Sequence, residues 1–174
     1  MYQFLSRVSN KYFKNHHHTL FKVFFNISPM YRRSTGKIIS VTKDLSRIEI
    51  KIPLSYKNKN YVGTIFGGSL FSATDPIYMV QLIQLLGRDY VVWDKSSSVK
   101  FKRPANSDAF AVFEFTEEEI TQLKTDIKEE KELALVKMVY LKSKEGKIFC
   151  EIEKTIYVAD KAYYKEKRKK RSNS

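Results

Sequence analysis

The chain has 174 residues and 43% of them are hydrophobic, which indicates a folded core and excludes an intrinsically disordered protein. The net charge of +13 lies at the ends: residues 1–43 hold eight basic and no acidic residues, and residues 161–174 hold seven basic and one acidic. Cys150 is the only cysteine, which excludes an internal disulfide and fits a reducing compartment. We therefore expect a cytoplasmic domain with basic ends.

Residues 1–36 are expected to form a basic, aromatic arm, with one or two short amphipathic helices in residues 2–27 and a linker over residues 30–36. Such a helix either packs on its own domain or lies on an anionic membrane surface, and the sequence leaves both open. No secretory leader is expected, because the first residues lack an apolar stretch before a cleavage site. The consecutive residues His16 to His18 cannot share one helix face, so no metal site is predicted.

The body of the chain, residues 37–160, is expected to be mainly β-structure. The alternation of apolar and polar residues predicts a hairpin, a long helix after residue 60, and then further strands with one charged segment among them. The predicted strands are 37–41, 47–52, 89–94, 98–103, 109–115, 133–142 and 147–159. The charged segment 117–132 is expected to be a short surface helix or a long turn. Residues 161–174 are expected to be a disordered basic tail. Strands grouped around one helix indicate an α+β fold.

The long helix lies within residues 60–87 and is apolar on most sides, with Asp75 as its only charge and Gly87 as its C-cap. Two interpretations of Asp75 are open. It can be an N-cap, with the helix beginning at Pro76, because proline suits the first helical position. Alternatively the helix begins near Gly67 and is kinked at Pro76, which leaves the Ser72 carbonyl unpaired and Asp75 available for chemistry.

The pattern N-x2-G-x3-G-G-x-L-x4-D, formed by Asn60, Gly63, Gly67, Gly68, Leu70 and Asp75, resembles the hotdog-fold acyl-CoA thioesterase superfamily. It is most similar to the phenylacetyl-CoA branch. The run GRDYVVWDKSSSVKFKRPA is similar to an uncharacterised family of the same superfamily. The resemblance covers about residues 35–160. It implies a curved antiparallel sheet around a central helix, and a homodimer or tetramer that joins sheets edge to edge.

The resemblance also implies hydrolysis of an acyl-CoA thioester, with no cofactor besides that substrate. Asp75 would be the nucleophile or the general base, and the N–H groups of Gly67 and Gly68 would bind the thioester oxygen. Asn60 would orient substrate or water. The chain departs from its relatives at Phe66, where they often have histidine, so this polar support is missing.

Further binding residues are predicted around this helix. Gly63 and Phe66 would line the substrate site, and Lys100, Lys102 and Arg103 are candidates to hold the CoA phosphates, although alternate residues of a strand face opposite ways. Gly68 and Asp75 are seven residues apart, roughly 10 Å along a helix at about 1.5 Å per residue. One helix therefore cannot bring both groups to one carbonyl, and we expect an active unit of at least two chains.

Two other functions remain open. The first is a non-catalytic protein that binds an acyl chain or a lipid carrier, with Phe66 lining a tunnel. The second is a module whose basic ends contact an anionic membrane or nucleic acid; nucleic acid is disfavoured because the body of the chain is nearly neutral. Three histidines confined to the N-terminal arm argue against a Ser-His-Asp triad, and the glycine turn lacks a nucleotide-binding fingerprint.

Overall fold

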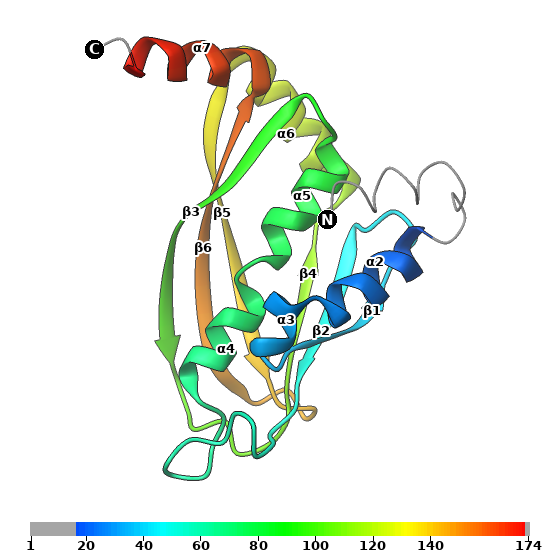
Figure 1. Cartoon of the computed structure of the whole chain (residues 1–174), viewed down its shortest axis with the longest axis vertical. Helices are drawn as coiled ribbons and strands as arrows, with labels where there is room; N and C mark the ends of the chain where they lie inside the picture. The colour runs from blue at the N-terminus through cyan, green and yellow to red at the C-terminus, as the bar shows by residue number, and fades with distance from the viewer. Residues whose placement is uncertain (1–16, 173–174) are drawn as a thin grey trace.

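The computed structural model describes residues 17–172, which form one curved sheet with a broken helix packed against it (Figure 1). The six strands are antiparallel and lie in the order β1-β2-β4-β5-β6-β3. The elements in chain order are α2 (His17–Ile27), α3 (Pro29–Arg33), β1 (Lys37–Val41), β2 (Arg47–Ile52), α4 (Gly67–Thr74), α5 (Ile77–Leu86), β3 (Tyr90–Phe101), β4 (Ala109–Glu114), α6 (Glu117–Glu130), β5 (Glu132–Lys142), β6 (Ile148–Asp160) and α7 (Lys161–Ser172). The predicted α+β hotdog architecture is confirmed.

The core lies between the sheet and the helix pair α4–α5. Every second residue of β2 points inward, so Ile48, Ile50 and Ile52 are fully buried. Leu70 of α4 and Leu82 of α5 belong to the same buried cluster. Burial of this size stabilises the fold by roughly 1.5–3 kcal/mol for each large apolar side chain. The apolar periodicity of the chain therefore fixes which face of the helix pair meets the sheet.

The long helix is broken at Pro76. Asp75 has helical backbone angles and its N–H donates to the Phe71 carbonyl at 3.0 Å, so it continues α4. Its side chain caps nothing at the start of α5. The N-cap interpretation of Asp75 is therefore wrong, and the alternative with a helix from Gly67 interrupted by proline is correct. The break follows from the missing N–H of proline.

The segment over residues 30–36, predicted to be a linker, contains the short helix α3 and anchors the helix break. Tyr31 is completely buried, and its hydroxyl donates to the Ala73 carbonyl, which lies near the end of α4, at 3.2 Å. Gly36 lies directly beside this contact, because a Cβ there would come within 2.8 Å of the Ala73 side chain and 3.0 Å of the Tyr31 hydroxyl. The linker prediction is wrong because one buried tyrosine holds this segment to α4.

Helix α2 covers the outer edge of β1. Its apolar face buries Phe21 and Phe25, which supports the prediction of a helix packed on its own domain. The Asn26 side chain bonds both backbone groups of Ile38: the Asn26 amide donates to the Ile38 carbonyl at 2.9 Å and the Ile38 N–H donates to Asn26 at 2.8 Å. Lys22 donates to the Ile39 carbonyl at 2.6 Å. These bonds satisfy backbone groups that an edge strand leaves open. The predicted helical part of residues 2–16 lies outside the described residues.

Strand β3 forms the other edge of the sheet and is longer than predicted. The strands expected at 89–94 and 98–103 are one continuous strand, Tyr90–Phe101, and the residues between the two predicted strands, 95–97, belong to it with a β-bulge between Asp94 and Ser96. Serines 96–98 pair with β6 in the sheet. The prediction of two separate strands is wrong because an exposed edge strand tolerates polar residues and a bulge. No described segment pairs with the outer edge of β3.

The prediction for the charged segment 117–132 is confirmed as a helix, whereas the prediction for the C-terminal segment is wrong. Helix α6 is confirmed and begins with a capping box between Thr116 and Glu119. The expected disordered tail is instead helical: α7 continues directly from β6 and packs against β3 and β6.

Within the described part of the chain, no helix has the length and apolarity to cross a membrane.

Replacing Tyr31 with phenylalanine should lower the free energy of unfolding by about 1–2 kcal/mol, because the buried Ala73 carbonyl then loses its partner. Tyr61→Phe is the matched control, since Tyr61 is fully exposed and its change should stay within about 0.5 kcal/mol. Urea denaturation of the three proteins measures both values. Equal stabilities for Tyr31→Phe and the wild type would show that this hydroxyl does not hold the helix break.

Candidate active site at the helix break

The predicted carboxylate is held by a lysine from the sheet. Lys154 of β6 donates to the Asp75 carboxylate at 2.6 Å. The Lys154 side chain is completely buried, whereas the Asp75 side chain is 46% exposed. The carboxylate is therefore fixed on one side by a cation and open to solvent on the other. This is the arrangement expected of an oriented acid that meets a ligand.

Lys154 also contacts a second acid, Asp94 of β3, with 3.3 Å between the ammonium and Oδ1 of Asp94. This contact is an ion pair without hydrogen-bond geometry. Burial raises the pKa of the Asp94 carboxyl, and the nearby Lys154 opposes that rise. The three groups form a partly buried cluster, Asp75–Lys154–Asp94, that joins α4, β6 and β3.

Sequence reasoning missed Lys154 and Asp94. A signal was present in β6, where Cys150, Ile152, Ile156 and Val158 alternate on the buried face with Lys154 among them. A lysine at an inward position requires a buried anion to pair with. The sequence offered no means of identifying that anion.

The glycine turn forms the start of α4. Gly67 and Gly68 are the first two helical residues after Phe66, and no side chain caps this end. The N–H groups of Ser69 and Leu70 both donate to the Phe66 carbonyl, at 2.9 and 3.2 Å. Within residues 17–172 the N–H groups of Gly67 and Gly68 have no acceptor. They are therefore available as donors to a ligand oxygen.

Two phenylalanine rings pack closely against this turn. A Cβ on Gly67 would lie 2.7 Å from the Phe101 ring, and a Cβ on Gly68 would collide with the Phe66 ring. Both rings are largely exposed, Phe66 at 57% and Phe101 at 60%. The glycine pair thus permits close ring packing as well as open N–H groups.

A cavity of about 430 Å³ adjoins the turn and collects four of the predicted residues, Asn60, Gly67, Lys102 and Arg103. Leu70 and Phe101 give it an apolar wall. Of the other predicted residues, Asp75, Gly63, Phe66, Gly68 and Lys100 do not line this cavity. We call it the glycine-turn cavity. One chain therefore separates the candidate acid from the candidate oxyanion donors, as the helix spacing predicted.

Several predicted residues have structural partners. The Asn60 side chain accepts from the N–H groups of Val62 and Thr64 at 3.1 and 3.0 Å and donates to the Thr64 hydroxyl at 2.9 Å. Gly63 has a φ of 83°, which glycine adopts readily. The hydrogen bonds of Asn60 and the backbone angle of Gly63 together shape the loop before α4.

The basic residues of the glycine-turn cavity also have partners. Lys102 pairs with Glu151 at 3.4 Å. Arg103 donates to the Ile148 carbonyl at 3.1 Å. Because Lys102 and Arg103 are themselves exposed, these bonds leave the cations accessible to an anionic ligand.

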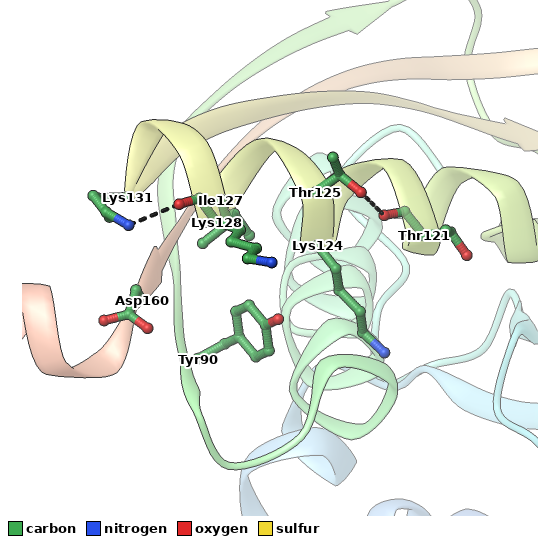
Figure 2. A pocket seen from close by; sticks show the side chains of 8 residues that line it. All are labelled: Tyr90, Thr121, Lys124, Thr125, Ile127, Lys128, Lys131 and Asp160. Atoms are coloured by element: carbon green, nitrogen blue, oxygen red, sulfur yellow. Dashed lines mark hydrogen bonds between the residues drawn. The ribbon is translucent and has the colours of Figure 1, made fainter.

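A separate cavity of about 420 Å³ lies beside α6 (Figure 2). Tyr90 of β3 projects into it, and Lys124 and Lys128 extend from the helix over the same space. None of the predicted site residues lines it, so it is not the candidate active site.

The family of domains of unknown function DUF4442 matches residues 17–158 of this chain. The chain belongs to the DUF4442 family. The matched range takes in α2 and α3 and ends before α7. No curated protein matches the sequence.

Solved structures share the fold of this DUF4442 protein. A protein of unknown function from Pseudomonas aeruginosa, named a probable thioesterase, has a TM-score of 0.72 at 18% identity and covers 82% of this chain and 95% of its own. A thioesterase from Haemophilus influenzae has a TM-score of 0.58 at 15% identity, with 82% and 90% covered. A thioesterase enzyme variant from Staphylococcus aureus has a TM-score of 0.54 at 11% identity, with 76% and 99% covered. The predicted resemblance to hotdog-fold thioesterases is confirmed as a likeness of fold.

Replacing Lys154 with methionine should destabilise this DUF4442 protein by about 3 kcal/mol at neutral pH, because Asp75 and Asp94 then share a partly buried site with no cation. This loss of stability should be smaller at acidic pH than at neutral pH. Without Lys154, burial raises the pKa of Asp94 unopposed, so the folded state keeps a proton that the unfolded chain has released. Stability then falls as the pH rises from the unfolded pKa of Asp to this raised value. Urea denaturation at about pH 4.5 and about pH 7.5 measures the difference.

The matched control is Lys51→Met, which breaks an ion pair with Asp108 whose side chains are 35% and 37% exposed. We expect a loss below about 1 kcal/mol for this surface pair at neutral pH. An equal loss of stability at both pH values for Lys154→Met would show that Lys154 does not affect the pKa of Asp94.

Proposed function

We propose that this DUF4442 protein hydrolyses an acyl-CoA thioester. The observation that carries the proposal is the Asp75 carboxylate, which is oriented by buried Lys154 and is 46% exposed beside a break in the central helix. The fold that it shares with proteins named thioesterases supports the reaction class. The open N–H groups of Gly67 and Gly68 supply the second requirement, a pair of donors for a developing oxyanion.

In the proposed reaction, Asp75 accepts a proton from a water molecule as that water attacks the thioester carbonyl carbon. The carbonyl oxygen gains negative charge and accepts hydrogen bonds from the glycine turn. The C–S bond then breaks, and the thiolate leaves as the CoA thiol after it takes up the proton. Lys154 is a positioning residue in this scheme, since it contacts Asp75 and not the substrate.

The two halves of this site come from different chains in the proposal. Gly67 and Asp75 are the first residue of α4 and the residue after its end, about 12 Å apart at about 1.5 Å per residue. Reacting groups must approach to about 3–3.5 Å. The outer edge of β3, unpaired within the described chain, offers the means to bring a second copy close.

The register of β3 fits this arrangement. The Gly67 turn lies against Phe101 at one end of β3, and Asp75 reaches Asp94 through Lys154 farther along the same strand. Because the bulge at Lys95 adds one residue to this stretch, Asp94 and Phe101 face the same side of β3 with Ser98 midway between them. In an antiparallel β3 pair with its two-fold axis at Ser98, Asp94 of one chain lies opposite Phe101 of the other. The glycine turn of each chain would then lie near Asp75 of its partner.

A second candidate function is acyl binding without turnover. The observation that favours it is Phe66, which stands where relatives often have histidine and packs its ring against Gly68. On this alternative the exposed rings of Phe66 and Phe101 hold the acyl chain. Binding of acyl-CoA with no release of free CoA would support it over hydrolysis.

Replacing Asp75 with asparagine should lower kcat for acyl-CoA hydrolysis at least about 100-fold, because the general base is lost while the shape of the side chain is kept. Release of free CoA can be followed with a thiol reagent. The protein adds no background, since Cys150 is buried and burial raises its pKa to about 11. Asp126→Asn on α6 is the control and should keep wild-type turnover. Full activity in Asp75→Asn would exclude this carboxylate as the base.

The oxyanion donors are tested at Gly67. Gly67→Pro removes one N–H, and proline suits the first helical position. The preceding Phe66 has φ −59° and ψ 130°, angles that are favourable before proline. Gly67→Ala is the matched control, because it also displaces the Phe101 ring but keeps the N–H. We expect a fall in kcat of about 100-fold or more for the proline variant beyond that of the alanine variant.

Mixing Asp75→Asn with Gly67→Pro protein tests the shared site. Each mixed dimer would hold one site with both changes and one intact site, so a random mixture of subunits should recover about a quarter of wild-type activity. Subunits are exchanged by mild denaturation and refolding, and sedimentation confirms the dimer. No recovery in a mixture shown to contain mixed dimers would place acid and donors in one chain.

A further inference from the structure

A third cavity, of about 390 Å³, lies beside the C-terminal helix α7 and is lined mainly by aromatic and basic side chains. Trp93 on β3, Tyr157 on β6 and Tyr164 on α7 supply three aromatic rings. The Trp93 side chain is 55% exposed, although tryptophan is a residue that folded proteins usually bury. We call this space the α7 cavity. Exposed rings beside a cavity are stacking surfaces for a planar base.

The same cavity carries an excess of positive charge. Lys95, Lys167, Arg168 and Arg171 all line it. Lys167 binds the Glu132 carboxylate, which also accepts from the Tyr157 hydroxyl, so this acid is already neutralised. The pKa of Glu132 is lowered, chiefly by its bond to Lys167.

The other three cations make no such close pair, although the charge of Arg171 also helps to lower the pKa of Glu132. Lys95, Arg168 and Arg171 form no ion pair within the described residues. The second acid of the α7 cavity, Asp94, is held by Lys154. Two arginines and a lysine with no paired anion can bind phosphate groups.

We propose that the α7 cavity binds the phosphorylated adenosine part of the CoA substrate. The adenine ring would stack on Trp93, and its phosphates would bind Arg168 and Arg171. This inference rests on the proposed function for the choice of CoA, whereas rings and cations by themselves indicate an aromatic base with phosphates. Helix α7 begins after the range matched by the DUF4442 family, so the α7 cavity is built in part from residues outside that domain.

The position of the α7 cavity relative to Asp75 supports this choice. Asp94 lines the cavity and contacts Lys154, which binds Asp75. The rings of Trp93 and Tyr157 face the side of the sheet opposite to Lys154, so the extended arm of a bound CoA would pass around the edge of β3 at residues 90–93 to present its thioester to Asp75. That part of the edge lies beyond the stretch that pairs in the proposed dimer. The α6 cavity of Figure 2 also has lysines, but it offers one ring and none of its lining residues belongs to the Asp75–Lys154–Asp94 cluster.

The single tryptophan of the chain gives a direct binding test, because Trp93 is the only source of tryptophan fluorescence. Titration with CoA and with adenosine 3′,5′-bisphosphate should each quench this fluorescence at saturation, whereas pantetheine should not. Arg168→Gln combined with Arg171→Gln should weaken CoA binding at least about tenfold, because two cations that bind phosphate are lost. Lys165→Gln, on the same helix but outside the cavity lining, is the control and should bind CoA like the wild type.

Two outcomes of the titration would overturn the proposal. One is the absence of quenching by CoA, and the other is equal quenching by pantetheine. Tighter binding of a single-stranded oligonucleotide than of CoA, with the same arginine dependence, would also overturn it, because the cavity would then belong to a nucleic-acid surface.

A kinetic comparison separates this proposal from the proposed function. The double arginine variant should raise KM for acyl-CoA about tenfold at unchanged kcat. It should leave hydrolysis of an N-acetylcysteamine thioester, which lacks the nucleotide, unaffected. Wild-type hydrolysis of both substrates with no arginine effect would overturn the nucleotide site alone. No hydrolysis of either would overturn the thioesterase proposal, and CoA quenching would then support the site as a binding site.

Discussion

The structure depends on one lysine that is removed from solvent and lies between two carboxylates. A buried ammonium without a counter-charge costs several kcal/mol, so Lys154 is stable under the helix because Asp75 and Asp94 lie beside it. This requirement ties the break in the central helix to two strands of the sheet. It also fixes the direction of the Asp75 carboxylate, and so links the packing of the fold to the chemistry that we propose.

The part of the site that local sequence determines was predictable. Asp75 is conspicuous as the single charge of an apolar helix, and the glycines that begin α4 produce a turn through their own backbone properties. Lys154 was not predictable as its partner, because the two residues are 79 positions apart and meet only after β6 has packed beneath α4. The strand pattern reveals a lysine on the buried face, but not which acid pairs with it.

The wrong predictions about the fold also arise from contacts between residues that are distant in sequence. The predicted linker contains α3 because Tyr31 bonds to a carbonyl on a helix more than forty residues away. The two strands predicted at 89–94 and 98–103 form one strand because β6 pairs with the serines between their apolar parts. The basic tail became α7, which packs on β3 and β6. In each case a contact that is distant in sequence outweighed the local propensity.

The capping of β1 by Asn26 has a consequence for how many copies can assemble through the sheet. Growth of a sheet needs an unsatisfied strand at both of its borders, and here one border is closed by a side chain that occupies the backbone of Ile38. The remaining border is the outer edge of β3. When two copies pair through β3 about a two-fold axis, neither copy has a free strand edge left. Such an assembly is finite by construction and cannot extend into a fibril, so any larger particle must use a different surface.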